Sequence, residues 1–96
     1  MREESGTTST GVDDVLSFEL SAYPNPVSGM LNIGVRGIET VDAVLHVMDF
    51  HGKLISVMEM KQSSVSIDMS SYASGIYLIR YKDAEGRTGT LKITKQ

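Results

Sequence analysis

The chain has 96 residues, a formal net charge of −3 at pH 7 and no cysteine. This length fits one small domain, and the missing cysteines exclude a disulfide framework and thiolate metal sites. The acidic balance argues against a nucleic-acid binder, which would carry a basic patch. Hydrophobic residues make up 41% of the chain, which separates it from disordered sequences, and no apolar run approaches the roughly 20 residues of a membrane-spanning helix.

Residues 1–14 are predicted to form a flexible linker or leader. The stretch from Ser5 to Gly11 contains only small or polar residues that cannot anchor a core, and Asp13 and Asp14 continue its solvated character. The N-terminus also lacks the apolar stretch of a secretory signal. We therefore expect a piece of a longer precursor, with residues 15–96 as its C-terminal domain.

From Val15 onward, the hydrophobic pattern has a period of two, which is typical of half-buried β-strands. Pro24 and Pro26 are expected to end the first strand because proline cannot donate to a β-ladder. The facing of the fourth strand is ambiguous. The predicted strands cover residues 18–22, 30–35, 44–50, 54–60, 64–69, 76–81 and 88–94.

Two turns share an Asp-x-x-Gly pattern, at Asp49–Gly52 and Asp83–Gly86. Aspartate at the first position and glycine at the fourth favour a type I turn closed by a left-handed residue. We therefore predict two hairpins, the first joining strands three and four and the second joining strands six and seven. Gly75 is predicted to need a positive φ.

Seven short strands with regularly spaced turns, and no helical pattern, predict an all-β fold: a seven-stranded antiparallel immunoglobulin-like β-sandwich. The Cys…Trp…Cys core of antibody domains is absent because the chain has neither residue type.

No residue pattern indicates a catalytic or metal site. His46 and His51 could be drawn with Asp42 and Asp49 as metal ligands, but His46 and Asp49 are an odd number of residues apart and should face opposite sides of a strand. No Gly-x-Ser-x-Gly nucleophile motif and no calcium-loop spacing occur. We expect a non-catalytic domain without a cofactor.

Three features allow either a structural or a binding interpretation. Tyr77 and Tyr81 share a strand face and either pack in the core or present rings to a sugar. The Tyr23–Pro26 segment is predicted to be stiff and stretched, and is either a corner between two sheets or a recognition strip. The last strand, with Lys92 and Lys95, either guards a sheet edge or offers a basic edge for strand addition.

A set of motifs occurs in order along the chain: Tyr23–Pro26, Leu31, Ile33, Val47, Asp49–Lys53, Ile67–Ser70, Gly75–Ile79 and Lys92–Gln96. This ordered set resembles the type A C-terminal sorting domain of the Bacteroidetes type IX (Por) secretion system. The resemblance covers about residues 20–96 and ends with the chain.

The resemblance implies an immunoglobulin-like sandwich that directs an attached cargo protein from the periplasm through the outer-membrane type IX translocon to the cell surface of a Gram-negative bacterium. It also implies a surface sortase that removes the domain and attaches the cargo to lipopolysaccharide, with cleavage in or near residues 5–17. Carried over by position, the expected recognition residues are Tyr23, Pro24, Asn25, Pro26, Gly52, Lys53, Gly75, Tyr77, Lys92 and Lys95.

The alternative is an accessory immunoglobulin-like domain of a surface protein that binds carbohydrate or acts as a spacer.

Overall fold

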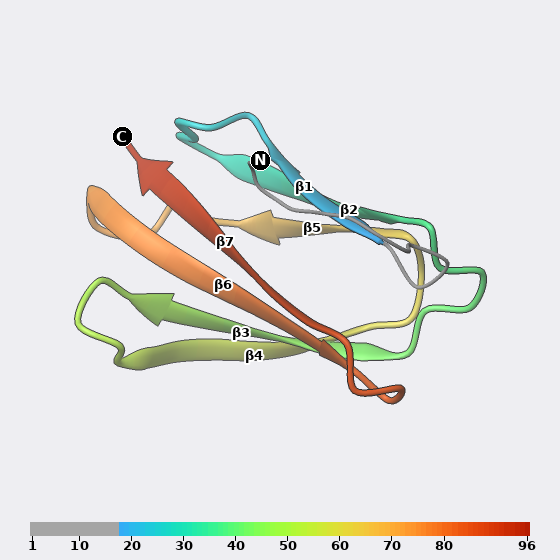
Figure 1. Ribbon diagram of the computed structural model, residues 1–96. Helices are drawn as coiled ribbons and strands as arrows, with labels where there is room; N and C mark the ends of the chain where they lie inside the picture. The colour runs from blue at the N-terminus through green and yellow to red at the C-terminus, as the bar shows by residue number, and fades with distance from the viewer. Residues whose placement is uncertain (1–17) are drawn as a thin grey trace, which may run out of the picture.

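Seven antiparallel strands form two sheets in the computed structural model, which describes residues 18–96 (Figure 1). The predicted leader, residues 1–14, lies outside the described residues, as does the expected cleavage region, residues 5–17. The three-stranded sheet has the order β1-β2-β5, with β1 at Glu19–Tyr23, β2 at Met30–Arg36 and β5 at Ser64–Asp68. The four-stranded sheet has the order β4-β3-β6-β7, with β4 at Leu54–Met60, β3 at Ala43–Asp49, β6 at Gly75–Asp83 and β7 at Thr88–Lys95.

The predicted sandwich is therefore confirmed, and its core follows from the period-two pattern. Leu31, Ile33 and Val35 of β2 face inward while the residues between them are half-buried. Burying each such side chain stabilises the fold by roughly 1.5–3 kcal/mol. The buried core contains Val27, Leu31, Ile33, Val35, Val41, Ala43, Leu45, Val47, Met60, Ile67, Met69, Tyr77, Ile79, Tyr81 and Ile93.

Both predicted hairpins are present, because β3 pairs with β4 and β6 pairs with β7. In the first turn, Gly52 has a φ of 87° and its N–H donates to the carbonyl of Asp49 at 3.0 Å. Gly86 has a φ of 88° and donates to the carbonyl of Asp83 at the same distance. The two aspartates close their turns in the same way, which explains why the short pattern predicted both hairpins.

The strand registers bring four chain segments to one end of the sandwich, here called the C-terminal end. They are the β1–β2 loop (residues 24–29), the β3–β4 turn (residues 50–53), the β5–β6 loop (residues 69–74) and the end of β7. Figure 1 shows these segments gathered on the side where the chain terminates. The β1 strand starts at the opposite end, where Glu19 pairs with Arg36.

The described part of the chain, residues 18–96, contains no helix of the length and apolarity needed to cross a bilayer.

The ambiguous facing of β4 has a physical cause. Val47 of β3 pairs with Ser56 and Met48 pairs with Leu54, so Ile55 is an extra residue in β4. This β-bulge interrupts the inside–outside alternation. Leu54 and Ile55 are therefore both exposed, whereas exposed and more buried residues alternate from Ile55 to Met60.

A charged network at the end opposite the C-terminal end ties the β6–β7 turn to the core. The buried Asp83 carboxylate accepts hydrogen bonds from the Tyr81 hydroxyl at 3.0 Å and from Arg87 Nη1 at 2.8 Å. Its other oxygen accepts the backbone N–H groups of Glu85 and Arg87. Burial alone would raise the pKa of Asp83, but these hydrogen bonds hold it below its ordinary value. Burial, together with the bond to Asp83, raises the pKa of Tyr81 to about 12.

Replacing Asp83 with asparagine tests this network. Because the carboxyl pKa is lowered by folding, its stabilising effect is full above the unfolded-state pKa of about 3.9 and is lost as pH falls through the lower folded-state pKa. We expect Asp83→Asn to lower the free energy of unfolding at pH 7 by about 1–3 kcal/mol. We also expect the difference from wild type to shrink toward pH 3. Urea unfolding at several pH values measures both, with the exposed Glu85→Gln as control. If the free energies of unfolding of wild type and Asp83→Asn are equal, or differ by the same amount at every pH, the stabilising role of the Asp83 carboxylate is wrong.

Candidate recognition surface

The C-terminal end brings together residues that the sequence analysis proposed for recognition. Tyr23 to Pro26 lie at the end of β1 and in the β1–β2 loop, and Gly52 and Lys53 lie in the β3–β4 turn. Gly75 starts β6 and pairs with Lys95, near the end of β7. Lys92 lies on the same terminal part of β7. Residues spread along the whole domain therefore converge on one end of the fold.

The Tyr23–Pro26 segment is bent, which corrects the prediction of a stretched strip. Residues 24–26 form bends, and the peptide bonds before Pro24 and Pro26 are cis. The segment joins two antiparallel neighbours of one sheet, so the chain has to reverse direction within the six residues between β1 and β2. The segment therefore connects two strands of the same sheet and is not a corner linking the two sheets. It nevertheless contacts β7 of the other sheet.

That contact begins with the side chain of Asn25. Its amide Nδ2 donates to the backbone carbonyl of Lys92 at 3.0 Å, and its Oδ1 accepts the backbone N–H of Thr94 at 2.9 Å. One amide group thereby satisfies a donor and an acceptor of β7, as a neighbouring strand would. The Asn25 side chain therefore makes the two hydrogen bonds to β7 that the backbone of an adjacent strand would make.

Val27 continues the contact with its backbone. Its N–H donates to the carbonyl of Thr94 and its carbonyl accepts the N–H of Gln96, both at 2.9 Å, in a parallel bridge with Lys95. The Val27 side chain is fully buried. A loop of the three-stranded sheet is therefore hydrogen-bonded to the last strand of the four-stranded sheet.

These bonds change the interpretation of the last strand. The outward backbone edge of β7 between Lys92 and Gln96 is occupied by the chain's own Asn25 and Val27, so this stretch is not an open edge for strand addition. Lys92 is exposed, whereas only 7% of Lys95 is accessible and its Nζ donates to the carbonyl of Gln96 at 2.9 Å. Inside–outside alternation explains the difference, because Lys95 shares the inward face of β7 with Ile93.

The tyrosines of β6 pack in the core and do not form a platform for sugars. Tyr77 is 7% exposed and Tyr81 is 1% exposed. The Tyr77 hydroxyl donates to the carbonyl of Ala73 at 2.6 Å, and its ring centroid lies 5.4 Å from that of Tyr72. Tyr77 thus holds the β5–β6 loop in place. Gly75 beside it has a φ of 149°, a positive value as predicted.

The β3–β4 turn presents Lys53 on a rigid frame. The Asp49 carboxylate accepts the backbone N–H groups of His51 and Lys53, both at 2.9 Å. These contacts, led by the bond from Lys53, lower the pKa of Asp49. The Lys53 and Gly52 positions are exposed, and the turn is closed by the left-handed Gly52.

Three exposed apolar residues lie at the same end: Tyr23, which was among the expected recognition residues, and Met30 and Phe50, which were not. The exposed fractions are 61% for Tyr23, 51% for Met30 and 65% for Phe50. All three sit in or beside the loops of the C-terminal end. Aromatic residues and methionine are enriched at protein interfaces, so this end has the composition of a contact surface. Period-two patterning could not find Met30 and Phe50 as contact residues, because it predicts only which strand residues face the core.

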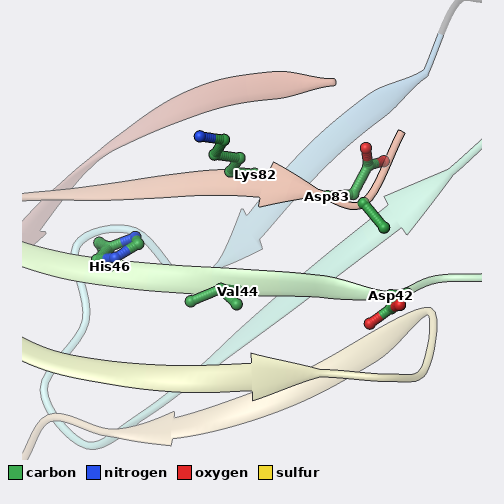
Figure 2. A pocket seen from close by; sticks show the side chains of 6 residues that line it. Asp42, Val44, His46, Lys82 and Asp83 are labelled. Carbon is green, nitrogen blue, oxygen red and sulfur yellow. The ribbon is translucent and has the colours of Figure 1, made fainter. Parts of the chain in front are cut away.

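The two histidines do not form a cation site with their acidic neighbours. His46 lies on the outer face of the four-stranded sheet, in a hollow of about 420 Å³ lined by residues of β3 and β6 and of the segments next to them. Figure 2 shows His46 and Val44 on one strand and Lys82 and Asp83 on its neighbour. Asp42, at the rim, pairs with Lys61, and His51 lies in the β3–β4 turn. Within residues 18–96, no three His, Asp or Glu side chains are placed to hold a metal ion.

Asn25 variants test the contact with β7. We expect Asn25→Ala to lower the free energy of unfolding by about 1–2 kcal/mol, because two backbone groups of β7 lose their partner. Amide hydrogen exchange at Thr94 should accelerate in Asn25→Ala and change less in Asn25→Asp, which keeps the acceptor oxygen. Exchange at Tyr81, in the centre of the four-stranded sheet, serves as internal control. Unchanged Thr94 exchange in Asn25→Ala would show that the side chain does not protect this strand.

Comparison with known proteins identifies the family and supports the fold. The family described as secretion system C-terminal sorting domain matches residues 21–96. A domain of PorZ, an essential surface component of the type IX secretion system of Porphyromonas gingivalis, superposes with a TM-score of 0.67 at 19% identity over 80% of this chain, which spans 11% of the PorZ chain. A DUF3244 family protein with an immunoglobulin-like β-sandwich from Bacteroides vulgatus superposes with a TM-score of 0.67 at 12% identity, covering 84% of this chain and 96% of that protein. No curated protein matches the chain. The match over most of the chain shows that it belongs to the family of type IX secretion system C-terminal sorting domains.

Proposed function

We propose that the C-terminal end of the sandwich is the surface by which the secretion machinery recognises this sorting domain. The observation that carries the proposal is the contact of Asn25 and Val27 with β7, which assembles the two most distant motifs of the sequence into one surface. A surface that is rigid before binding loses little conformational entropy on binding. Family membership supplies the role of a non-catalytic sorting signal.

The chemistry of this end suits a protein partner. Exposed Tyr23 and Phe50 offer aromatic anchors, and exposed Lys53 and Lys92 add positive charge around them. Buried aromatic anchors supply most of the energy of protein interfaces, whereas charges at the rim favour association with a partner of opposite sign. We infer a reader with apolar pockets and a negatively charged surround.

The position of the cargo is compatible with this arrangement. The chain enters the described domain at the start of β1, where Glu19 pairs with Arg36 at the end away from the recognition surface. A cargo domain upstream of residue 18 is thus joined to the domain at the end opposite the recognition surface. The longest dimension of the described domain is 40 Å.

In this proposal, the precursor crosses the periplasm, the outer-membrane type IX translocon reads the C-terminal end, and the cargo reaches the cell surface or the medium. A surface sortase then cleaves upstream of the domain, within or near residues 5–17, and joins the cargo to lipopolysaccharide. The domain contributes recognition alone and uses no cofactor.

A reporter fusion tests the proposal. A periplasmic reporter followed by residues 1–96 is expected to reach the surface of a bacterium that has a type IX system, measured by protease accessibility and fractionation. Deleting Lys92–Gln96 should retain the fusion in the periplasm, because Asn25 and Val27 lose their partners. Retention of the intact fusion would contradict the proposed role.

Two surface variants separate recognition from folding. Phe50→Ser and Lys92→Glu alter exposed side chains of the C-terminal end and should reduce export several-fold while leaving the free energy of unfolding within about 0.5 kcal/mol of wild type. Lys82→Glu makes the matched charge change nearer the opposite end and should export normally. Normal export of both test variants would place the recognition surface elsewhere on the domain.

A further inference from the structure

An aromatic side chain closes the core at the point where the chain enters the described domain. Phe18 lies just before β1 and continues the inward face formed by Leu20 and Ala22, because alternate residues of a strand point to the same side. All three side chains pack against the buried core. They do so at the end of the sandwich opposite the C-terminal end, where β1 begins.

Phe18 packs against a tyrosine of the other sheet. The ring centroids of Phe18 and Tyr81 lie 5.5 Å apart, with 36° between the ring planes, which is within the range of favourable aromatic pairs. Tyr81 is itself buried, and its hydroxyl donates to Asp83 in the charged network of the β6–β7 turn. The ring that receives Phe18 is therefore held in place by the core and by this network.

Gly89 of β7 leaves the room that this packing needs. It pairs with Tyr81 in the four-stranded sheet. A Cβ atom on Gly89 would lie 2.5 Å from Cδ1 of Leu20 and 3.9 Å from Cζ of Phe18. Carbon atoms in contact lie about 3.5–4.0 Å apart, so a side chain at this position would displace Leu20. Glycine thus allows the start of β1 to lie closely over β7.

This packing limits where a protease can cut. A bond within packed structure is cut when that structure opens locally. Opening the start of β1 requires Phe18 to leave Tyr81 and Leu20 to leave Gly89. A protease also holds residues on both sides of the cut bond in an extended form, and three extended residues span about 10 Å. Bonds immediately upstream of Phe18 are therefore too close to the domain for a protease to enclose.

We propose that Phe18, packed on Tyr81 and over Gly89, sets the C-terminal limit of the cleavage that releases the domain. The sortase then cuts no closer to the domain than the bond between Asp14 and Val15. This inference rests on the proposed function and narrows the expected cleavage region from residues 5–17 to residues 5–15.

Cleavage at this limit leaves the sandwich whole. One peptide bond breaks: its acyl group stays with the cargo for transfer to lipopolysaccharide, and its amino group takes up a proton and becomes the new N-terminus of the domain. All seven strands lie downstream of the cut. The released domain therefore keeps its core, with Phe18 still packed in place.

Digestion of residues 1–96 with a protease of broad specificity, followed by mass spectrometry, tests the Phe18 contact. The stable fragment of wild type should begin upstream of Phe18 and extend to Gln96. Phe18→Ala removes the ring and Gly89→Val displaces Leu20, so each variant should give a fragment that begins beyond Leu20. Thr90→Val changes an exposed position of the same strand and should leave the fragment as in wild type.

Amide hydrogen exchange separates local opening from loss of the fold. Exchange at Ser21, which pairs with β2, should accelerate about tenfold in Phe18→Ala and Gly89→Val, while Ile79 in the centre of the four-stranded sheet stays protected. Phe18→Leu keeps an apolar side chain and should lie between wild type and Phe18→Ala. Equal acceleration at Ser21 and Ile79, a wild-type fragment that begins beyond Leu20, or variants that keep the wild-type fragment would each overturn the proposal.

Deletions in the exported reporter fusion test the limit itself. Residues are removed one at a time upstream of Phe18, starting with Ser17, and the cut bond is identified from the N-terminus of the released domain. Cleavage should stop when the recognised bond comes within about three residues of Phe18, while export continues, and Phe18→Ala should then restore cleavage. Cleavage that continues up to Phe18, or no restoration by Phe18→Ala, would overturn the limit. The digestion of purified protein needs no secretion machinery, so it tests the Phe18 contact even if the fusion is not exported, a result that would count against the proposed function alone.

Discussion

Hydrogen bonds between the β1–β2 loop and the end of β7 join the two sheets of the described domain, in addition to the packing of side chains in the core. Asn25 and Val27 each satisfy one donor and one acceptor near the end of the last strand. At about 0.5–1.5 kcal/mol for each bond, this contact contributes a sizeable share of the roughly 5–15 kcal/mol by which a domain is stable. Losing it would free the last strand at its outer edge and unsettle the loop that faces it.

This constraint links folding to function. The N-terminal proline motif and the C-terminal lysine motif form one surface only when the sandwich is assembled around β2, β6 and β7. A machine that reads this surface would therefore read a folded domain, because the unfolded chain holds the same residues far apart. If the proposed surface is the one recognised, the sorting signal of this domain is a tertiary structure whose two motifs depend on each other.

Much of the fold could be predicted from local chemistry. The period-two pattern located the seven strands to within about two residues, and the Asp-x-x-Gly turns located two hairpins because the aspartate side chain and the glycine act within five residues. The positive φ of Gly75 followed from its place before a strand. The bulge at Ile55 was not predictable, since it depends on how two strands align and not on either one alone.

The site was harder to predict, for physical reasons. The contact of Asn25 joins residues 67 and 69 positions apart, and a side chain that imitates a strand has no periodic signal. The burial of Lys95 did have a signal: it shares strand parity with Leu91 and Ile93, and alternation alone places it inward. The positive charge of Lys95, by contrast, led to the expectation that its side chain is exposed. The exposed Phe50 lies in a turn, where hydrophobic periodicity does not apply.

We propose that the secretion machinery contacts the C-terminal end of the sandwich. Photo-crosslinking amino acids placed one at a time at exposed positions of the domain, in cells exporting the reporter fusion, test this most directly. We expect crosslinks to outer-membrane secretion components from positions 50, 53 and 92, and none from positions 39 and 85 at the other end. Crosslinks concentrated at positions 39 and 85 would contradict it.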